Sequence, residues 1–200
     1  MVNKIPEYYE NPIDVQLLKT CSFTSTLLYK LNMTPNQITT LSLISGLLSI
    51  YYYKTQHYIK CGIFFFFSYY FDCLDGFYAR KYKMVTKFGD IYDHIKDWLI
   101  IILFAYLIYN NDNVNSKFKN ISLIILASML FMVFLHFRYQ EIYYHNKTTT
   151  DSEYSIMKNL FENLLSNKNY DNMRYTRFFG SGTWNIIFIL FLMMHKYYTK

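Results

Sequence analysis

Apolar residues in this chain are gathered into five long runs, which polar and charged stretches separate. The runs cover residues 38–53, 58–71, 98–109, 121–137 and 178–194. Each approaches the ~20 residues that an α-helix needs to cross the hydrocarbon core of a bilayer, although the first and third are short. Thr34 and Pro35 precede the first run as a helix start. Five such runs in 200 residues would leave soluble helices little surface for water. The pattern therefore predicts an all-α, polytopic membrane protein.

Two further segments place apolar residues at helical spacing but with charges among them. Residues 14–31 predict an amphipathic helix, and we assign 1–34 to a cytoplasmic N-terminal segment and 35–200 to the membrane domain. In 154–165, Lys158 and Glu162 interrupt the apolar stripe, which favours a helix lying in the membrane interface. The prediction is five spans, or six if 154–165 inserts. No cleavable signal peptide is expected, because the N-terminal segment lacks a compact apolar core.

The distribution of basic residues predicts the orientation. If the N-terminus is cytoplasmic and the five runs alternate, fourteen of the 20 Lys and Arg residues lie on the cytoplasmic side. Cytoplasmic loops are enriched in these residues, so the segment between the second and third runs is expected to face the cytoplasm. The formal net charge of +6 then reflects topology and lipid headgroups, and no nucleic-acid partner is expected.

Composition adds two exclusions. Hydrophobic residues make up 52% of the chain and aromatic residues 21%, with 6 Gly and 3 Pro, which excludes a disordered, a collagen-like and a turn-rich β-sandwich chain. The 3 cysteines are odd in number and lack CxxC spacing, which argues against a disulfide framework and a zinc knuckle.

Candidate chemistry lies between the second and third runs. At 100° per residue, five residues fall within an arc of about 140° on one helix: Asp72, Asp75, Gly76, Ala79 and Arg80. Gly89, Asp93 and Asp97 follow at spacings of four and form a stripe on the next helix. Two carboxylate faces are therefore expected to meet across an antiparallel helix pair.

Four carboxylates at membrane depth would be costly, on the order of 2.5–3.5 kcal/mol each, unless they are protonated or bind cations. All-oxygen ligand sets favour hard ions such as Mg²⁺, Mn²⁺ or Ca²⁺, and two divalent ions would balance four carboxylates. A two-metal site suits displacement at phosphorus, because it stabilises the attacking and leaving oxygens together. Gly76 and Ala79 leave room for a ligand, and Arg80 supplies a fork suited to phosphate. For any single aspartate, a solvated helix end paired with a nearby lysine is the simpler alternative.

The eight residues together resemble the signature of the CDP-alcohol phosphotransferase family, also called CDP-alcohol phosphatidyltransferases: D-x2-D-G-x2-A-R-x8-G-x3-D-x3-D. Every specified position is matched at the stated spacing. The segment 31–39, Leu-Asn-Met-Thr-Pro-Asn-Gln-Ile-Thr, also resembles that family's lead into its first membrane helix. Family members usually have six spanning helices, whereas this chain shows five clear runs.

The resemblance implies a metal-dependent enzyme of phospholipid synthesis, which displaces CMP from a CDP-linked donor and passes the remaining phosphate to an acceptor hydroxyl. It implies two divalent ions, Mg²⁺ or Mn²⁺, held by Asp72, Asp75 and Asp93, with Asp97 able to share the site. Asp97 is the implied general base, and a homodimer is also implied. The implied nucleotide contacts, with Gly89 permitting close helix approach, are Asp72, Gly76, Ala79, Arg80 and Gly89.

Three arginines are candidates for binding the acceptor or a phosphate: Arg138 at the end of the fourth run, and Arg174 and Arg177 before the fifth. Guanidinium groups suit an anionic acceptor or the donor's phosphates. Each arginine can also be explained as a basic residue that anchors the cytoplasmic end of a membrane span. The segment 174–177 is similar to one that precedes the fifth helix in eukaryotic phosphatidylinositol synthases. The small chain favours CDP-diacylglycerol as donor, and we rank inositol first as acceptor, followed by glycerol 3-phosphate and serine.

Three alternatives stay open on the sequence alone. A CDP-choline or CDP-ethanolamine:diacylglycerol phosphotransferase would share the signature. A membrane cation transporter would use the aspartates as an ion path, and a catalytically silent relative would serve as a membrane scaffold. Asp90 and His94 lie outside the signature, and we expect both to be local polar residues.

Overall fold

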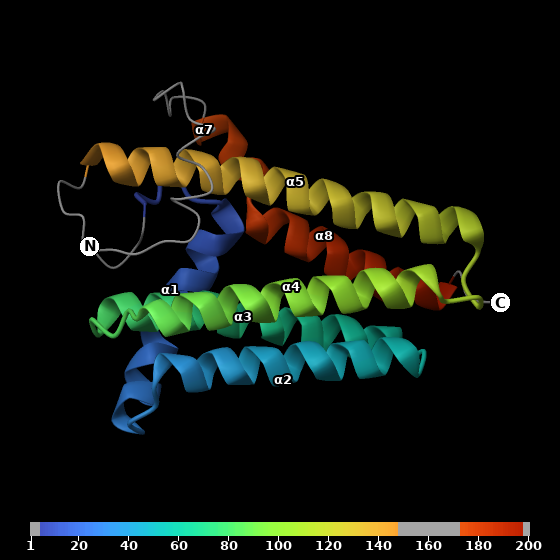
Figure 1. Ribbon diagram of the computed structural model, residues 1–200, viewed down its shortest axis with the longest axis horizontal. Coiled ribbons are helices and arrows are strands. Elements are labelled where there is room, and N and C mark those ends of the chain that lie inside the picture. Colours follow the sequence, from blue (N-terminus) through green and yellow to red (C-terminus); the bar gives the residue numbers. More distant parts are fainter. Residues whose placement is uncertain (1–4, 148–172, 198–200) are drawn as a thin grey trace.

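The computed structural model describes residues 5–147 and 173–197, which form helices and no strand. The helices α2, α3, α4, α5 and α8 run roughly along the long axis of the molecule, and α1 crosses them near one end (Figure 1). The all-α prediction is confirmed for this part of the chain. The elements are α1 (Pro12–Lys30), α2 (Pro35–Lys54), α3 (Tyr58–Lys81), α4 (Lys87–Tyr109), α5 (Ser116–Lys147), α7 (Met173–Thr176), α8 (Ser181–Met194) and the 3₁₀ turns η1 (Arg177–Phe179) and η2 (His195–Tyr197).

Local capping signals set where the first two helices begin. The Thr34 side chain accepts a hydrogen bond from the backbone N–H of Gln37, whose own side chain accepts from the backbone N–H of Thr34. This capping box, followed by Pro35 in the first turn, starts α2 where the sequence predicts. Asn11 caps α1 by accepting from the N–H of Ile13. The predicted N-terminal helix is confirmed, with bounds Pro12–Lys30 in place of 14–31.

Over its middle turns, the buried face of α2 consists of small and mostly polar residues, whereas its exposed face is apolar. Ser42 Oγ donates to the carbonyl oxygen of Ser68 on α3 at 2.8 Å, and Ser68 Oγ donates back to the Ser42 carbonyl at 2.9 Å. Ile44 and Leu47 are 49% and 42% exposed. This arrangement is the reverse of a soluble amphipathic helix and is typical of helices that associate within a bilayer. The small buried residues of α2 are Ser42, Ser45, Gly46 and Ser49.

Large apolar side chains are also exposed on the other long helices. Soluble proteins rarely leave contiguous apolar faces open to water, so these faces indicate a lipid environment. Within the described ranges, the stretches Ser116–Gln140 and Met173–Tyr197 are long and apolar enough to cross a membrane. Examples of the exposed residues are Ile63 and Phe67 on α3, Ile102 and Tyr106 on α4, Ile124 and Phe131 on α5, and Leu190 and Met194 on α8.

The predicted count of five to six spans is not confirmed. The hydroxyl-rich face of α2 and the charged signature residues of α3 and α4 lower the hydropathy of these helices, and 154–165 lies outside the described residues.

Two predicted boundaries also shift. The α4 helix begins at Lys87, well ahead of the apolar run at 98–109, because Thr86 caps it. In the fifth run, predicted from residue 178, the 3₁₀ turn η1 and an extended Gly180 come first, and α8 therefore begins at Ser181.

Among the described residues, two of the three apolar clusters pack the long helices and α1 together. The larger cluster lies between α2, α3, α4 and α8 and includes Phe65, Phe104 and Phe188, whose rings contact one another edge to face. The smaller cluster joins α1 to α2 and α3 and includes Cys21 and Leu74, both fully buried. Because Leu74 lies between two signature aspartates, packing of this cluster fixes the part of α3 that carries them.

Candidate active site

The signature residues occupy the last turns of α3 and the first turns of α4, on either side of a short connection. Lys83 in this connection has a left-handed backbone with φ of 57°, and the N–H of Met84 donates to the Ala79 carbonyl at 2.8 Å. This ends α3 in the way a C-terminal helix cap requires. The next helix starts when Thr86 Oγ accepts from the N–H of Gly89 at 3.1 Å. The chain thereby reverses within a few residues and returns the second half of the signature toward the first.

Three of the four predicted metal ligands come together in space. The carboxylate oxygens of Asp72, Asp93 and Asp97 all lie within 4.8 Å of one another. Their side chains are 31%, 30% and 49% exposed, so a ligand can reach them. Asp75 lies outside this group. It is 5% exposed, and its Oδ2 has no hydrogen-bond partner among the described residues.

A lysine that the signature does not include lies among these carboxylates. The Lys96 ammonium is 2.9 Å from an oxygen of Asp93 and 2.9 Å from an oxygen of Asp97. It also donates to Asp72 Oδ1 and, at 3.2 Å, to Ser42 Oγ of α2. The side chain is only 2% exposed. Lys96 therefore joins α4 to both α2 and α3 at the candidate site.

The ligand set fits a hard divalent cation. Carboxylate oxygens are the donors that Mg²⁺ and related ions prefer, and Asp72, Asp93 and Asp97 offer three at close range. A buried oxygen without a partner is energetically costly, and Oδ2 of Asp75, one turn after Asp72 on α3, is such an oxygen among the described residues. The residues present can therefore hold a divalent ion.

The predicted nucleotide contacts line the same part of the helix pair. A Cβ atom added at Gly76 would lie 3.2 Å from a guanidinium nitrogen of Arg80, so that side chain lies over the glycine. Ala79 and Arg80 are half-buried. A Cβ atom at Gly89 would lie 3.0 Å from Oδ1 of Asn36, which shows that the starts of α2 and α4 approach closely there. The absence of a side chain at these glycines thus lets Arg80 lie over Gly76 and lets the starts of α2 and α4 approach each other.

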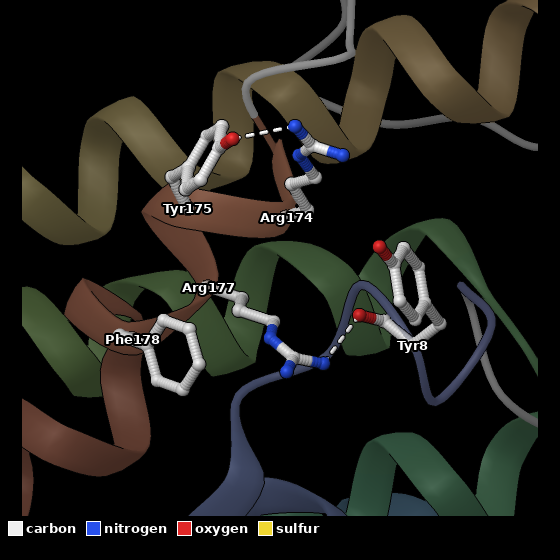
Figure 2. A pocket seen from close by; sticks show the side chains of 5 residues that line it. All are labelled: Tyr8, Arg174, Tyr175, Arg177 and Phe178. Atoms are coloured by element: carbon white, nitrogen blue, oxygen red, sulfur yellow. Dashed lines mark hydrogen bonds between the residues drawn. The ribbon is translucent and has the colours of Figure 1, made fainter.

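Two of the three candidate arginines line one pocket of about 380 Å³, together with three aromatic residues (Figure 2). The Arg177 guanidinium lies 4.7 Å from the ring centre of Phe178 and 5.5 Å from that of Tyr8, and it donates a hydrogen bond to the Tyr8 carbonyl. Arg174 lies 4.6 Å from the ring centre of Tyr175. Arg138 is not among the residues that line this pocket. The structure thus brings Arg174 and Arg177 together and leaves Arg138 outside.

A hydrogen-bond network through α1 connects this pocket to α3. The Asn11 side chain donates to the Arg177 carbonyl at 2.6 Å. One turn later, Asp14 accepts from the Tyr69 hydroxyl of α3, from Ser181 Oγ at 3.0 Å and from the Gly182 N–H at 3.2 Å. Burial raises the pKa of the Asp14 carboxyl to about 6. Because Tyr69 is one turn before Asp72, α1 ties the arginine-bearing segment to the helix that carries the acids.

Comparison with known proteins identifies the family. Residues 32–157 match the profile of the family described as CDP-alcohol phosphatidyltransferase. The chain belongs to the CDP-alcohol phosphatidyltransferase family. The match covers residues 32–39 of the lead-in segment, the whole signature and α5, so it extends well beyond the signature on which the resemblance was found.

Curated relatives match a shorter segment. A CDP-diacylglycerol–glycerol-3-phosphate 3-phosphatidyltransferase of Rickettsia typhi is 41% identical over 44 residues, which are 22% of this chain and 25% of the relative. The protein of the same name from Rickettsia felis is 43% identical over 44 residues, which are 22% of this chain and 24% of the relative. The match thus spans about a quarter of the length of these relatives. No solved structure is significantly similar to the chain.

Sequence reasoning about this family member missed two features of the site. Lys96 lies between two signature positions, and the positive-inside pattern explains it only as a cytoplasmic charge. It nevertheless shares the buried stripe of α4 with Ile100, Phe104 and Ile108 at spacings of four. That periodicity was the signal that Lys96 points inward. Tyr8, in the N-terminal segment, also lines the arginine pocket. No local sequence pattern predicts a contact between residues so far apart in the chain.

Proposed function

We propose that the chain is a membrane-bound transferase that moves a phosphatidyl group from CDP-diacylglycerol to the hydroxyl of glycerol 3-phosphate and releases CMP. The observation that carries this proposal is the convergence of Asp72, Asp93 and Asp97 in a member of this family, whose enzymes transfer substituted phosphate groups. A cation transporter or a scaffold would not need the signature's glycine, alanine and arginine positions beside the acids.

In the proposed reaction, the acceptor oxygen forms a bond to the phosphorus that carries the diacylglycerol. The bond from that phosphorus to the oxygen that bridges to the cytidylyl phosphate breaks, and CMP leaves with the bridging oxygen. Asp97 accepts the hydroxyl proton as general base. Asp72, Asp75 and Asp93, with Asp97 able to share, are the proposed ligands of two divalent ions, Mg²⁺ or Mn²⁺, which when bound stabilise charge on the phosphate oxygens. Gly76, Ala79, Arg80 and Gly89 are the proposed nucleotide contacts.

Two observations support glycerol 3-phosphate over inositol, which the sequence ranked first. The relatives that match are named for glycerol 3-phosphate. The pocket that Arg174 and Arg177 line also favours an anionic acceptor, because guanidinium groups bind phosphate strongly, whereas inositol carries no charge. The α1 network fixes the position of this pocket relative to the helix that carries Asp72 and Asp75. Arg138 keeps only its proposed role in anchoring.

We also propose that the protein is multi-pass, that its active site faces the cytoplasm and that two copies form a homodimer. The exposed apolar faces of α2, α3, α4, α5 and α8 support a lipid environment around all five helices. Basic residues concentrated at the connection between α3 and α4 support a cytoplasmic location for that end of the bundle.

The test is transfer activity of the purified full chain in detergent–lipid micelles with CDP-diacylglycerol and Mg²⁺. Glycerol 3-phosphate, inositol and serine are offered in separate reactions, and CMP release is read together with the lipid product by mass spectrometry. We expect product with glycerol 3-phosphate alone and none from Asp72→Asn. Consumption of inositol or serine instead would refute the acceptor. A further reaction with CDP-choline or CDP-ethanolamine and diacylglycerol tests the donor, and no transfer in any reaction would refute the enzyme.

A further inference from the structure

Lys96 points into the protein because of its place on the helix. It is followed at spacings of four by Ile100, Phe104 and Ile108, which are 5%, 0% and 1% exposed. These four residues form the buried stripe of α4. The direction of the Lys96 side chain is therefore set by the packing of the whole helix, independently of the acids near its tip.

The charge at the end of this side chain requires partners. A buried ammonium without counter-charges would be strongly destabilising, and Lys96 is only 2% exposed. Its counter-charges are Asp72, Asp93 and Asp97, the three residues whose oxygens converge. The ammonium and a divalent ion would thus share the same three carboxylate groups.

We propose that the Lys96 ammonium is a resident cation of the aspartate site, which competes with a divalent ion for the oxygens of Asp72, Asp93 and Asp97. Four carboxylates and one ammonium leave a net charge of minus three, so the site attracts divalent ions less strongly than four free carboxylates would. Ser42 Oγ, 3.2 Å from the ammonium, is a neutral partner that can keep Lys96 in place when an ion takes the carboxylates.

The consequence is that Lys96 lowers the affinity of the site for divalent ions while keeping the acids together without them. The first effect follows from competition for the same ligands, and the second from neutralising acids that would otherwise repel one another. This inference rests on the metal-binding part of the proposed function. It is independent of which donor or acceptor the protein uses.

The test is Mn²⁺ binding to the purified full chain in detergent, without substrates, measured from the electron paramagnetic resonance signal of free Mn²⁺. Lys96→Met removes the charge and keeps the length of the side chain. We expect this variant to bind Mn²⁺ at least about tenfold more tightly than the wild type, whereas Lys96→Arg, which keeps the charge, stays within a few-fold of it. Lys83→Met is the matched control, because Lys83 is exposed in the connection between α3 and α4 and the net charge changes equally.

A second variant and a second measurement test the proposal if Lys96→Met folds poorly. Lys96→Gln retains a polar group that can reach Ser42, and its melting temperature in EDTA is compared with that in Mn²⁺. We expect a larger Mn²⁺-dependent rise than in the wild type. Equal or weaker Mn²⁺ binding by Lys96→Met and Lys96→Gln would overturn the proposal, as would an equal gain in Lys83→Met. Binding that Asp72→Asn does not reduce would also overturn it, because the ion would then lie elsewhere.

Discussion

At the scale of single residues, Asp97 differs from the acids beside it in being the most open. Its side chain is 49% exposed, against 31% for Asp72 and 30% for Asp93. An open carboxylate can meet an arriving hydroxyl group, which suits the general base. Asp97→Asn keeps the size of the side chain but removes the proton acceptor, so we expect CMP release to fall by about 10²–10⁴-fold. Binding of the CDP-linked donor, measured by calorimetry, should remain.

The matched control for this prediction is Asp90→Asn. Asp90 lies two turns before Asp97 on α4, outside the group of converging oxygens, and its Oδ1 is 3.8 Å from Nδ1 of His94. Its replacement makes the same change of charge and should leave CMP release within a few-fold of the wild type. Equal losses in the two variants would show that Asp97 acts only through the charge of the region.

Arg174 allows the acceptor to be tested apart from catalysis. It lines the aromatic pocket of Figure 2 and lies at its exposed edge. If this pocket holds the phosphate of glycerol 3-phosphate, Arg174→Gln should raise KM for that acceptor about tenfold, as expected for the loss of one charge-assisted contact, with kcat little changed. Arg138→Gln changes the charge equally but does not alter the pocket lining, and its KM should match the wild type. Steady-state kinetics with varied acceptor decide between these outcomes.

At the scale of helices, the junction between α1 and α8 depends on a close approach. A Cβ atom added at Gly182 would lie 2.6 Å from Oδ1 of Asn11 and 2.8 Å from Oδ1 of Asp14. Both residues belong to the network that ties α1 to α8, through Nδ2 of Asn11 and Oδ2 of Asp14, so Gly182→Ala should push the helices apart. We expect a loss of about 1–3 kcal/mol, as for other overpacked sites, which thermal unfolding followed by circular dichroism would detect as a melting temperature lowered by several degrees.

Gly76→Ala controls for the general effect of replacing a helical glycine. There the added Cβ would meet only the end of the Arg80 side chain, at 3.2 Å, and that side chain can move. Alanine also favours helix by about 1 kcal/mol over glycine. The melting temperature of Gly76→Ala should therefore equal or exceed that of the wild type, and a similar fall in both variants would argue against a specific junction at Gly182.

The helices show which parts of the molecule are predictable from sequence. Local signals such as Thr34 with Pro35 set helix starts, and the spacing of the signature acids predicts that Asp72, Asp93 and Asp97 converge. Contacts between distant segments carry no such signal. Tyr8 meets Arg177 across nearly the whole chain, and Asp14 meets Tyr69 only because α1 folds across the end of the bundle. The inward direction of Lys96 was readable from its periodicity, but its neighbours in α2 and α3 were not.

At the scale of the whole molecule, the two ends of α4 should lie on opposite sides of the membrane. The helix has 23 residues, which at 1.5 Å per residue span about 35 Å, more than the ~30 Å of a hydrocarbon core. The connection to α3 at one end is rich in basic residues, whereas the connection to α5 at the other holds asparagines and Asp112. Figure 1 shows these connections at opposite ends of the bundle. Positively charged connections face the cytoplasm.

Single cysteines at these two connections test this arrangement in sealed cells. Lys83→Cys and Asn113→Cys are both exposed positions, and the native Cys21, Cys61 and Cys73 are first replaced by alanine. A maleimide that cannot cross membranes should label position 113 in intact cells, and position 83 only after the membrane is permeabilised. Labelling of both positions in intact cells, or of neither, would mean that α4 does not cross the membrane in the proposed orientation. Labelling of position 83 alone would show that the protein has the opposite orientation, with the aspartate site on the outer face. That result would contradict the orientation that the positive-inside rule predicts.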